Sequence, residues 1–206
     1  NFEKAMLFKQ LQEGQQYKDY LEVAYLQNPR AKEIVLEYAR HLFLQKSFKR
    51  STQVLKGYSD TAEFDIEISK DLSFSSVQSE QYDIALKELE KQRSLSDETY
   101  DVDLKKAHIY NLMGDLRLAE SIYLDLLAQK ENQEALYYLS KLYLKQNKNE
   151  DAAFLLAKIS EESDYYGESI GPVYLNGTLG IEVQKAIDFV TTPGRHPEEI
   201  VEYLLL

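Results

Sequence analysis

Apolar residues recur every three or four positions along most of the chain, in stretches separated by short polar segments. This spacing places apolar side chains on one side of an α-helix. Four of the polar segments are only three residues long, and two of them carry a glycine or an asparagine, residues that suit the end of a helix. These segments are 45–47, 79–81, 113–115 and 146–148. The pattern predicts pairs of antiparallel helices joined by tight turns.

The predicted helix pairs repeat at an interval of 34 residues, with one interval of 33. Small residues form a first column of the repeat: Ala5, Ala39, Ser73, Ala107 and Ser140. A second, mostly small column holds Tyr17, Ser51, Ala85, Ala119 and Ala152. A column of large residues holds Leu21, Leu55, Leu89, Tyr123 and Leu156. One hairpin cannot bury its apolar face alone, but stacked hairpins can, so the sequence predicts an array.

This pattern resembles the tetratricopeptide repeat (TPR) family, whose unit is a helix–turn–helix of about 34 residues. The fourth unit carries the resemblance best, with Ala107, Tyr110, Gly114, Ala119 and Tyr123. The resemblance implies an all-α fold, a right-handed α-solenoid of stacked antiparallel helix pairs, and the alternative is an irregular helical bundle. Its five units are 1–31, 32–65, 66–99, 100–132 and 133–165. The third unit is unusually polar where packing is expected, because it has serine at positions 73 and 76.

Residues 166–206 depart from the repeat. The stretch 166–181 carries four of the eight glycines in the chain, and glycine destabilises a helix interior. This stretch is either the bent first helix of a divergent sixth pair or a small hairpin around Asn176 and Gly177. The segment from Pro197 to Leu206 starts a further helix of the same array. Because that helix is still apolar at its last residue, we expect the chain to be part of a longer protein.

Composition and charge narrow the range of functions. The chain has 24 Lys and Arg residues against 35 Asp and Glu residues, a formal net charge of -11. This balance argues against a nucleic-acid partner, which needs clustered cations. No apolar run is long enough for membrane insertion. There is no cysteine, the three histidines lack metal-ligand spacing, and no phosphate-binding loop or nucleophile motif is present. We therefore predict no enzyme activity, no catalytic residue, no metal and no cofactor.

One face of each predicted first helix points away from its packing residues and mixes cations with apolar groups. In TPR proteins the first helices line the concave face, so the resemblance implies a groove there. Aromatic and arginine side chains in a concavity are common binding anchors. The expected partner-binding residues are Arg40, Lys70, Phe74, His108, Asn111, Tyr137, Lys141 and Lys145. The alternative is that these are ordinary mixed surface positions, some of which pack against a neighbouring unit.

Two functions follow from this interpretation. The first is a non-catalytic interaction scaffold that binds a peptide or protein segment with apolar anchors and some acidic groups. The second is a structural or self-assembling spacer of a larger protein, for example a cell-envelope or secretion protein, which associates through residues 166–206. The sequence leaves the oligomeric state open, and it allows both a cytoplasmic and a bacterial periplasmic or envelope location.

Overall fold

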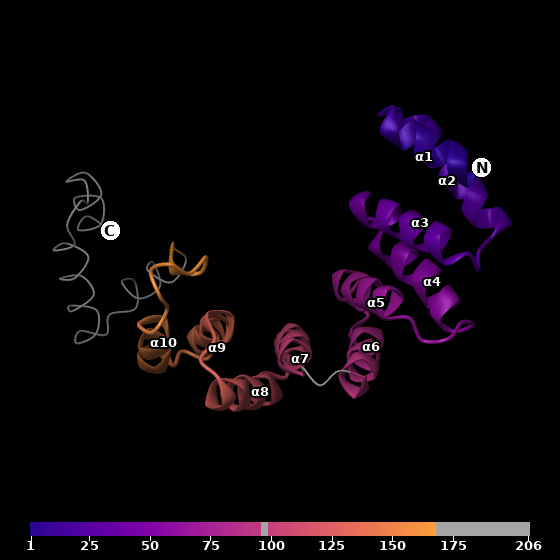
Figure 1. Ribbon diagram of the computed structural model, residues 1–206. Coiled ribbons are helices and arrows are strands. Elements are labelled where there is room, and N and C mark those ends of the chain that lie inside the picture. Colours follow the sequence, from indigo (N-terminus) through magenta and orange to yellow (C-terminus); the bar gives the residue numbers. More distant parts are fainter. Residues whose placement is uncertain (96–98, 168–206) are drawn as a thin grey trace, which may run out of the picture. The chain divides into compact units, whose positions relative to one another are not determined.

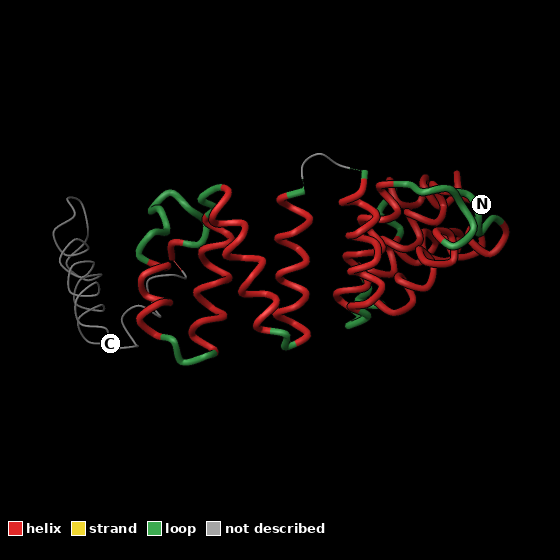
Figure 2. The backbone as a smooth tube through the Cα atoms, turned by 90° about the horizontal axis from the view of Figure 1, so that it is seen from below, coloured by secondary structure: helices red, strands yellow, loops and turns green. Residues whose placement is uncertain are grey.

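The computed structural model describes residues 1–95 and 99–167, and every regular element among them is an α-helix (Figures 1 and 2). In chain order these helices are α1 (Phe2–Gln10), α2 (Gly14–Gln27), α3 (Lys32–Leu44), α4 (Phe48–Ser59), α5 (Ile66–Gln78), α6 (Tyr82–Ser94), α7 (Tyr100–Met113), α8 (Leu116–Gln129), α9 (Gln133–Lys145) and α10 (Asn149–Leu156). The chain divides into two compact units, residues 1–109 and 110–206, with the border inside α7. Consecutive helices pack as antiparallel pairs, so the predicted fold class is confirmed.

The helix bounds can be set beside the predicted repeat units. Two helices fall within each of the five predicted ranges between residues 1 and 165. The shorter interval of 33 residues falls in the loop 130–132 between α8 and α9, where one residue is lost without shortening either helix. The predicted sixth pair, the choice between a bent helix and a hairpin, and the last apolar helix concern residues that, from 168 onward, lie outside the described part of the chain.

The repeat columns form the buried core of the helix pairs. The five large-column residues, from Leu21 to Leu156, are all at most 1% exposed. The first small column is also buried, and its most exposed member is Ser73 at 8%. In the compact unit of residues 1–109, which is called the first unit below, Leu21 and Leu55 join buried side chains of α1, α3, α4 and α5 in one cluster. Within each of the two units the repeat columns are therefore buried between packed helices, as a stacked array requires.

All five hairpin turns close with the same backbone geometry. In the turn between α3 and α4, the Ser47 N–H donates to the Leu42 carbonyl at 2.9 Å and the Lys46 N–H donates to the Phe43 carbonyl at 2.8 Å, the Schellman arrangement. The residue at the position of Lys46 has a positive φ in every turn: Gln12 59°, Lys46 58°, Glu80 60°, Gly114 84° and Asn147 59°. The backbone thus forces three ordinary side chains into the left-handed conformation that glycine and asparagine adopt readily.

Lys46→Gly is expected to raise the free energy of unfolding by about 0.5–1 kcal/mol, because glycine avoids the steric cost of the left-handed conformation. Gly114→Ala should lower it by a similar amount, although a Cβ at Gly114 would meet no atom within 4 Å. Urea denaturation of both variants and the parent protein measures the two effects. A Lys46→Gly protein no more stable than its parent would contradict this account of the turn.

The polar third repeat, residues 66–99, packs against the second repeat through hydrogen bonds between buried hydroxyl groups. The Ser51 hydroxyl of α4 donates to the Ala39 carbonyl at 2.8 Å, and its oxygen lies 3.0 Å from the Ser75 hydroxyl of α5. Since Ser51 has only one proton to donate, Ser75 is the donor in the second bond. Thr52 and Ser79 form a similar pair at 3.1 Å. Partners on the adjacent helix thus satisfy Ser75 and Ser79. Of the two serines singled out in the sequence, Ser73 donates to the Lys70 carbonyl of its own helix at 2.9 Å, and the buried Ser76 hydroxyl has no hydrogen-bond partner among the described residues.

Ser51→Ala is expected to lower the free energy of unfolding by about 1–2 kcal/mol, because the buried Ser75 hydroxyl loses its acceptor. Adding Ser75→Ala should recover much of this loss, since no buried donor is then left without a partner. A double-mutant cycle of the two variants, measured by urea denaturation, gives the coupling energy. Strictly additive losses would show that the two hydroxyls do not act as a pair.

Candidate protein-interaction site

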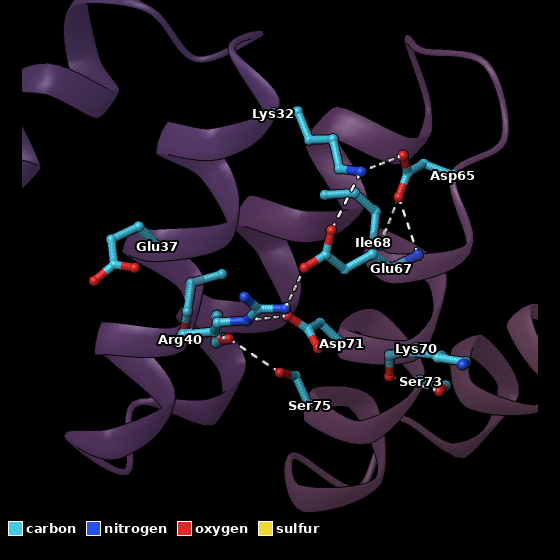
Figure 3. A network of polar contacts seen from close by, with 12 residues as sticks. Lys32, Glu37, Arg40, Asp65, Glu67, Ile68, Lys70, Asp71, Ser73 and Ser75 are labelled. Atoms are coloured by element: carbon cyan, nitrogen blue, oxygen red, sulfur yellow. Dashed lines mark hydrogen bonds and ion pairs between the residues drawn. The ribbon is translucent and has the colours of Figure 1, made fainter. Parts of the chain in front are cut away.

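An ion-pair network joins the facing surfaces of α3 and α5 in the first unit (Figure 3). The Lys32 ammonium lies 2.6 Å from a carboxylate oxygen of Asp65 and 3.2 Å from one of Glu67. The Arg40 guanidinium donates from Nη2 to Glu67 at 2.9 Å and from Nε to Asp71 at 2.6 Å. Figure 3 shows Arg40 reaching from α3 toward the two carboxylates of α5. The network fixes the direction in which Arg40 points.

The network favours the ionised forms of Glu67 and Asp65. Hydrogen bonding from Arg40 lowers the pKa of Glu67, and hydrogen bonding from Lys32 lowers the pKa of Asp65. Two cations face three carboxylates, so the five side chains together carry one net negative charge. The pairs are exposed to solvent and each contributes little to the free energy of unfolding. Their structural effect is to hold Arg40 in place through its Nε and Nη2 groups.

A pocket of about 340 Å³ lies beside this network, between α3, α4 and α5. The Arg40–Asp71 pair lines one part of it, and the aromatic side chains Phe43 and Phe74 line another. The Phe43 and Phe74 rings stack with their centroids 4.9 Å apart. Phe74 is 58% exposed and Leu44, which also lines the pocket, is 78% exposed. Exposed apolar side chains around a concavity are what a binding partner covers.

The predicted binding residues of the first unit are not all in this pocket. Arg40 and Phe74 line it, Arg40 in the ion-pair network and Phe74 in the aromatic stack. Lys70 is exposed one helical turn before Phe74 and is in no ion pair with a residue of the described ranges. His108 lies on α7 and is half-buried. The structure therefore brings two of the four predicted residues of this unit together.

In the second unit the predicted residues form two contacts of their own. Asn111 of α7 is 9% exposed and accepts a hydrogen bond from the Lys145 Nζ of α9 at 3.3 Å. The Lys141 Nζ donates to the Tyr137 hydroxyl at 2.9 Å and lies 4.9 Å from the centre of its ring. Tyr137 is only 5% exposed, because the Tyr165 ring stacks on it at 4.9 Å. Tyr137 is thus covered by the chain itself, whereas Phe74 is open to solvent.

The sequence interpretation missed Lys32 and Asp71. Asp71 follows Arg40 by 31 residues and Glu67 follows it by 27. Residues one 34-residue repeat apart occupy equivalent positions on consecutive first helices. Asp71 lies three residues, and Glu67 seven residues, before the position on α5 that is equivalent to Arg40, which is about one and two helical turns. Opposite charges at these separations are the sequence signal that would have revealed the network.

Two further properties of the described part bear on function. Residues 1–95 and 99–167 contain no group of three His, Asp or Glu side chains placed to hold a metal ion. Among the helices of the same ranges, none combines the length and apolarity needed to cross a membrane.

The repeated helix pairs, their Schellman turns and their buried columns define a TPR-like helical-repeat protein. No protein-family model matches the sequence, and no curated protein matches it. Among solved structures, the MamA protein is similar with a TM-score of 0.64 and 13% identity, over 81% of this chain and 92% of MamA.

Two solved TPR proteins are also similar to this chain. A thermophilic TPR protein of Thermus thermophilus has a TM-score of 0.55 and 18% identity, over 84% of this chain and 97% of its own. A TPR protein of Parabacteroides merdae has a TM-score of 0.56 and 15% identity, over 84% of this chain and 68% of its own. At these identities the likeness establishes the fold, so the TPR-like fold that the sequence resemblance implied is confirmed.

Proposed function

We propose that this chain is a non-catalytic protein-interaction scaffold that binds a peptide or protein segment along the faces of its first helices. The TPR-like fold supports an interaction scaffold in general terms. The observation that carries the proposal is the pocket between α3, α4 and α5, with exposed Phe74 and Leu44 at its edge. Concave sites with apolar walls and a few fixed polar groups are where ligands bind most often.

Within this proposal the two units have different roles. In the first unit, Arg40 and Phe74 line an open pocket, so we assign the first contacts with the partner to this face. In the second unit, Tyr137 is stacked on Tyr165, so a partner must displace Tyr165 or bind beside it, at Lys141. Each unit is thus proposed to present a binding face of its own on its first helices.

Selection of peptides from a random phage-displayed library, followed by calorimetric titration, tests the proposal. Phe74→Ala and Leu44→Ala are each expected to weaken binding of a selected peptide about tenfold or more, because each removes an exposed anchor. Phe154→Ala on α10 is the matched control, since Phe154 is 51% exposed but lies outside the pocket. Selected peptides whose affinity is unchanged by both pocket variants would contradict a binding site at this face.

A second candidate function is self-assembly as a structural spacer, and one observation in the first helix favours it. Leu7 is equivalent in the repeat to His41 and Ser75. His41 contacts Tyr17 of α2, and Ser75 contacts Ser51 of α4, so each of them packs against the second helix of the preceding repeat. Leu7 itself is 53% exposed. A second copy of the chain could cover this position with a helix. Light scattering over a wide concentration range tests this, and a protein that stays monomeric throughout would contradict it.

A further inference from the structure

We infer that the pocket between α3, α4 and α5 takes one apolar side chain of a partner peptide whose flanking residues are basic. This inference rests on the proposed function and adds the chemistry of the partner. It departs from the sequence-based expectation of a partner with acidic groups, because that expectation treated Arg40 as an available cation. Three features carry it: the walls of the pocket, the bonding of Arg40 and the charges of the two helices.

The walls favour an apolar group. Phe43, Phe74 and Leu55 supply apolar surface, and the serines that line the pocket are Ser51 and Ser75. Both serine hydroxyls already have hydrogen-bond partners, in the chain from Ser75 through Ser51 to a backbone carbonyl. A polar ligand group would lose its water and find no unmet partner at these hydroxyls, whereas an apolar side chain gains from leaving water.

Arg40 is not placed to hold a carboxylate of the partner. Its guanidinium already pairs with Asp71 at 2.6 Å and with Glu67 at 2.9 Å. A carboxylate of the partner would be the third one beside Arg40. It would enter a network that already has one net negative charge, and the neighbouring carboxylates would repel it. The guanidinium has five N–H groups, so those not used by the two carboxylates can donate to neutral acceptors such as the backbone carbonyls of a peptide.

Two of the three helices around the pocket, α3 and α5, together carry more acids than cations. The third, α4, carries Lys49, Arg50 and Lys56 and no acid, and of these Arg50 is paired with Glu22 and Lys56 with Asp60. Helix α3 and residues 65–78 contain five carboxylates, Glu33, Glu37, Asp65, Glu67 and Asp71. They contain three cations, Lys32, Arg40 and Lys70. A lysine or arginine next to the anchoring side chain is attracted to the α3–α5 side of the pocket, where the ion-pair network carries one net negative charge, over the screening distance of about 8–10 Å at physiological salt. Charge complementarity of this kind selects partners and speeds their association.

Three synthetic peptides of equal length test the inference by NMR titration of the isotopically labelled chain. The first has a central leucine between lysines, the second has the leucine between glutamates, and the third has a central serine between lysines. We expect the first peptide to shift the amide signals of Leu44 and Phe74 and to bind about tenfold or more tightly than either of the others. Its affinity should fall as salt is added.

Three variants locate the effect. Phe74→Ala should weaken binding of the lysine–leucine peptide about tenfold, while Phe154→Ala should leave it unchanged. Glu33→Lys should reduce the preference for lysine over glutamate flanks, because it removes an exposed acid of α3 that is in no ion pair within the described ranges. Circular dichroism of each variant confirms that the helices are intact.

The outcomes separate this inference from the proposed function. If the glutamate-flanked peptide binds the pocket as tightly as the lysine-flanked one, the inference is wrong and the scaffold function stands. The same holds if no designed peptide binds here but library-selected peptides bind at α7 or α9. If neither designed nor selected peptides bind at any first helix, both the inference and the proposed function are overturned.

Discussion

Tyr123→Ala is expected to lower the free energy of unfolding by about 3–5 kcal/mol, among the largest effects of any single substitution in this chain. Tyr123 is 0% exposed and is the largest of the fully buried side chains in the described residues. Removing it leaves a cavity beside α8 that the surrounding helices cannot fill completely. Since small domains are stable by only about 5–15 kcal/mol, urea denaturation should show a large fall in the midpoint.

Tyr123→Phe is the matched control, and it should leave the stability unchanged or raise it. The Tyr123 hydroxyl is buried and has no hydrogen-bond partner among the residues that the structure describes, so phenylalanine keeps the ring and removes an unsatisfied polar group. A Tyr123→Phe protein as unstable as Tyr123→Ala would show that the hydroxyl, and not the ring, holds α8 in place.

The same pair of proteins should differ in alkaline solution. Burial raises the pKa of Tyr123 above its ordinary value. Above about pH 10 the unfolded chain releases this proton while the folded chain keeps it, so the stability falls as the pH rises, by at most about 1.4 kcal/mol per pH unit. Tyr123→Phe should lack this contribution. If the free energies of unfolding of the two proteins, measured by urea denaturation, fall equally steeply with pH above pH 10, burial of a neutral phenol is contradicted.

Ala85→Leu is expected to lower the free energy of unfolding by about 1–3 kcal/mol, because it forces extra atoms into a close-packed site. Ala85 is 0% exposed and belongs to the second small column, in the core cluster of α6 and α7. Ala128→Leu on the exposed side of α8 is the control, since alanine and leucine have similar helix propensities. Equal stabilities of the two variants in urea would show that the small column does not mark a close helix contact.

The sequence determined the helix pairs, their interval and their buried columns. Whether a residue is buried in a stacked array depends on its position around its own helix, and the spacing of apolar residues reveals that position. Four of the five hairpin turns were predicted in the same way, although glycine and asparagine marked only two of them, and the turn at Gln12 was not predicted. Gln12, Lys46 and Glu80 adopt the same left-handed conformation, because the packing of the two helices leaves the connecting chain no other path.

Only the tertiary structure decided which surface groups are open and which are already paired. Phe74 and Tyr137 were equal candidates in the sequence, but Phe74 is exposed while Tyr137 lies under Tyr165. Arg40 was expected to be an available cation, but it is held by Glu67 and Asp71. The physical reason is that side-chain pairing depends on the axial offset between neighbouring helices. A hydrophobic pattern fixes the buried face of each helix and leaves that offset undetermined.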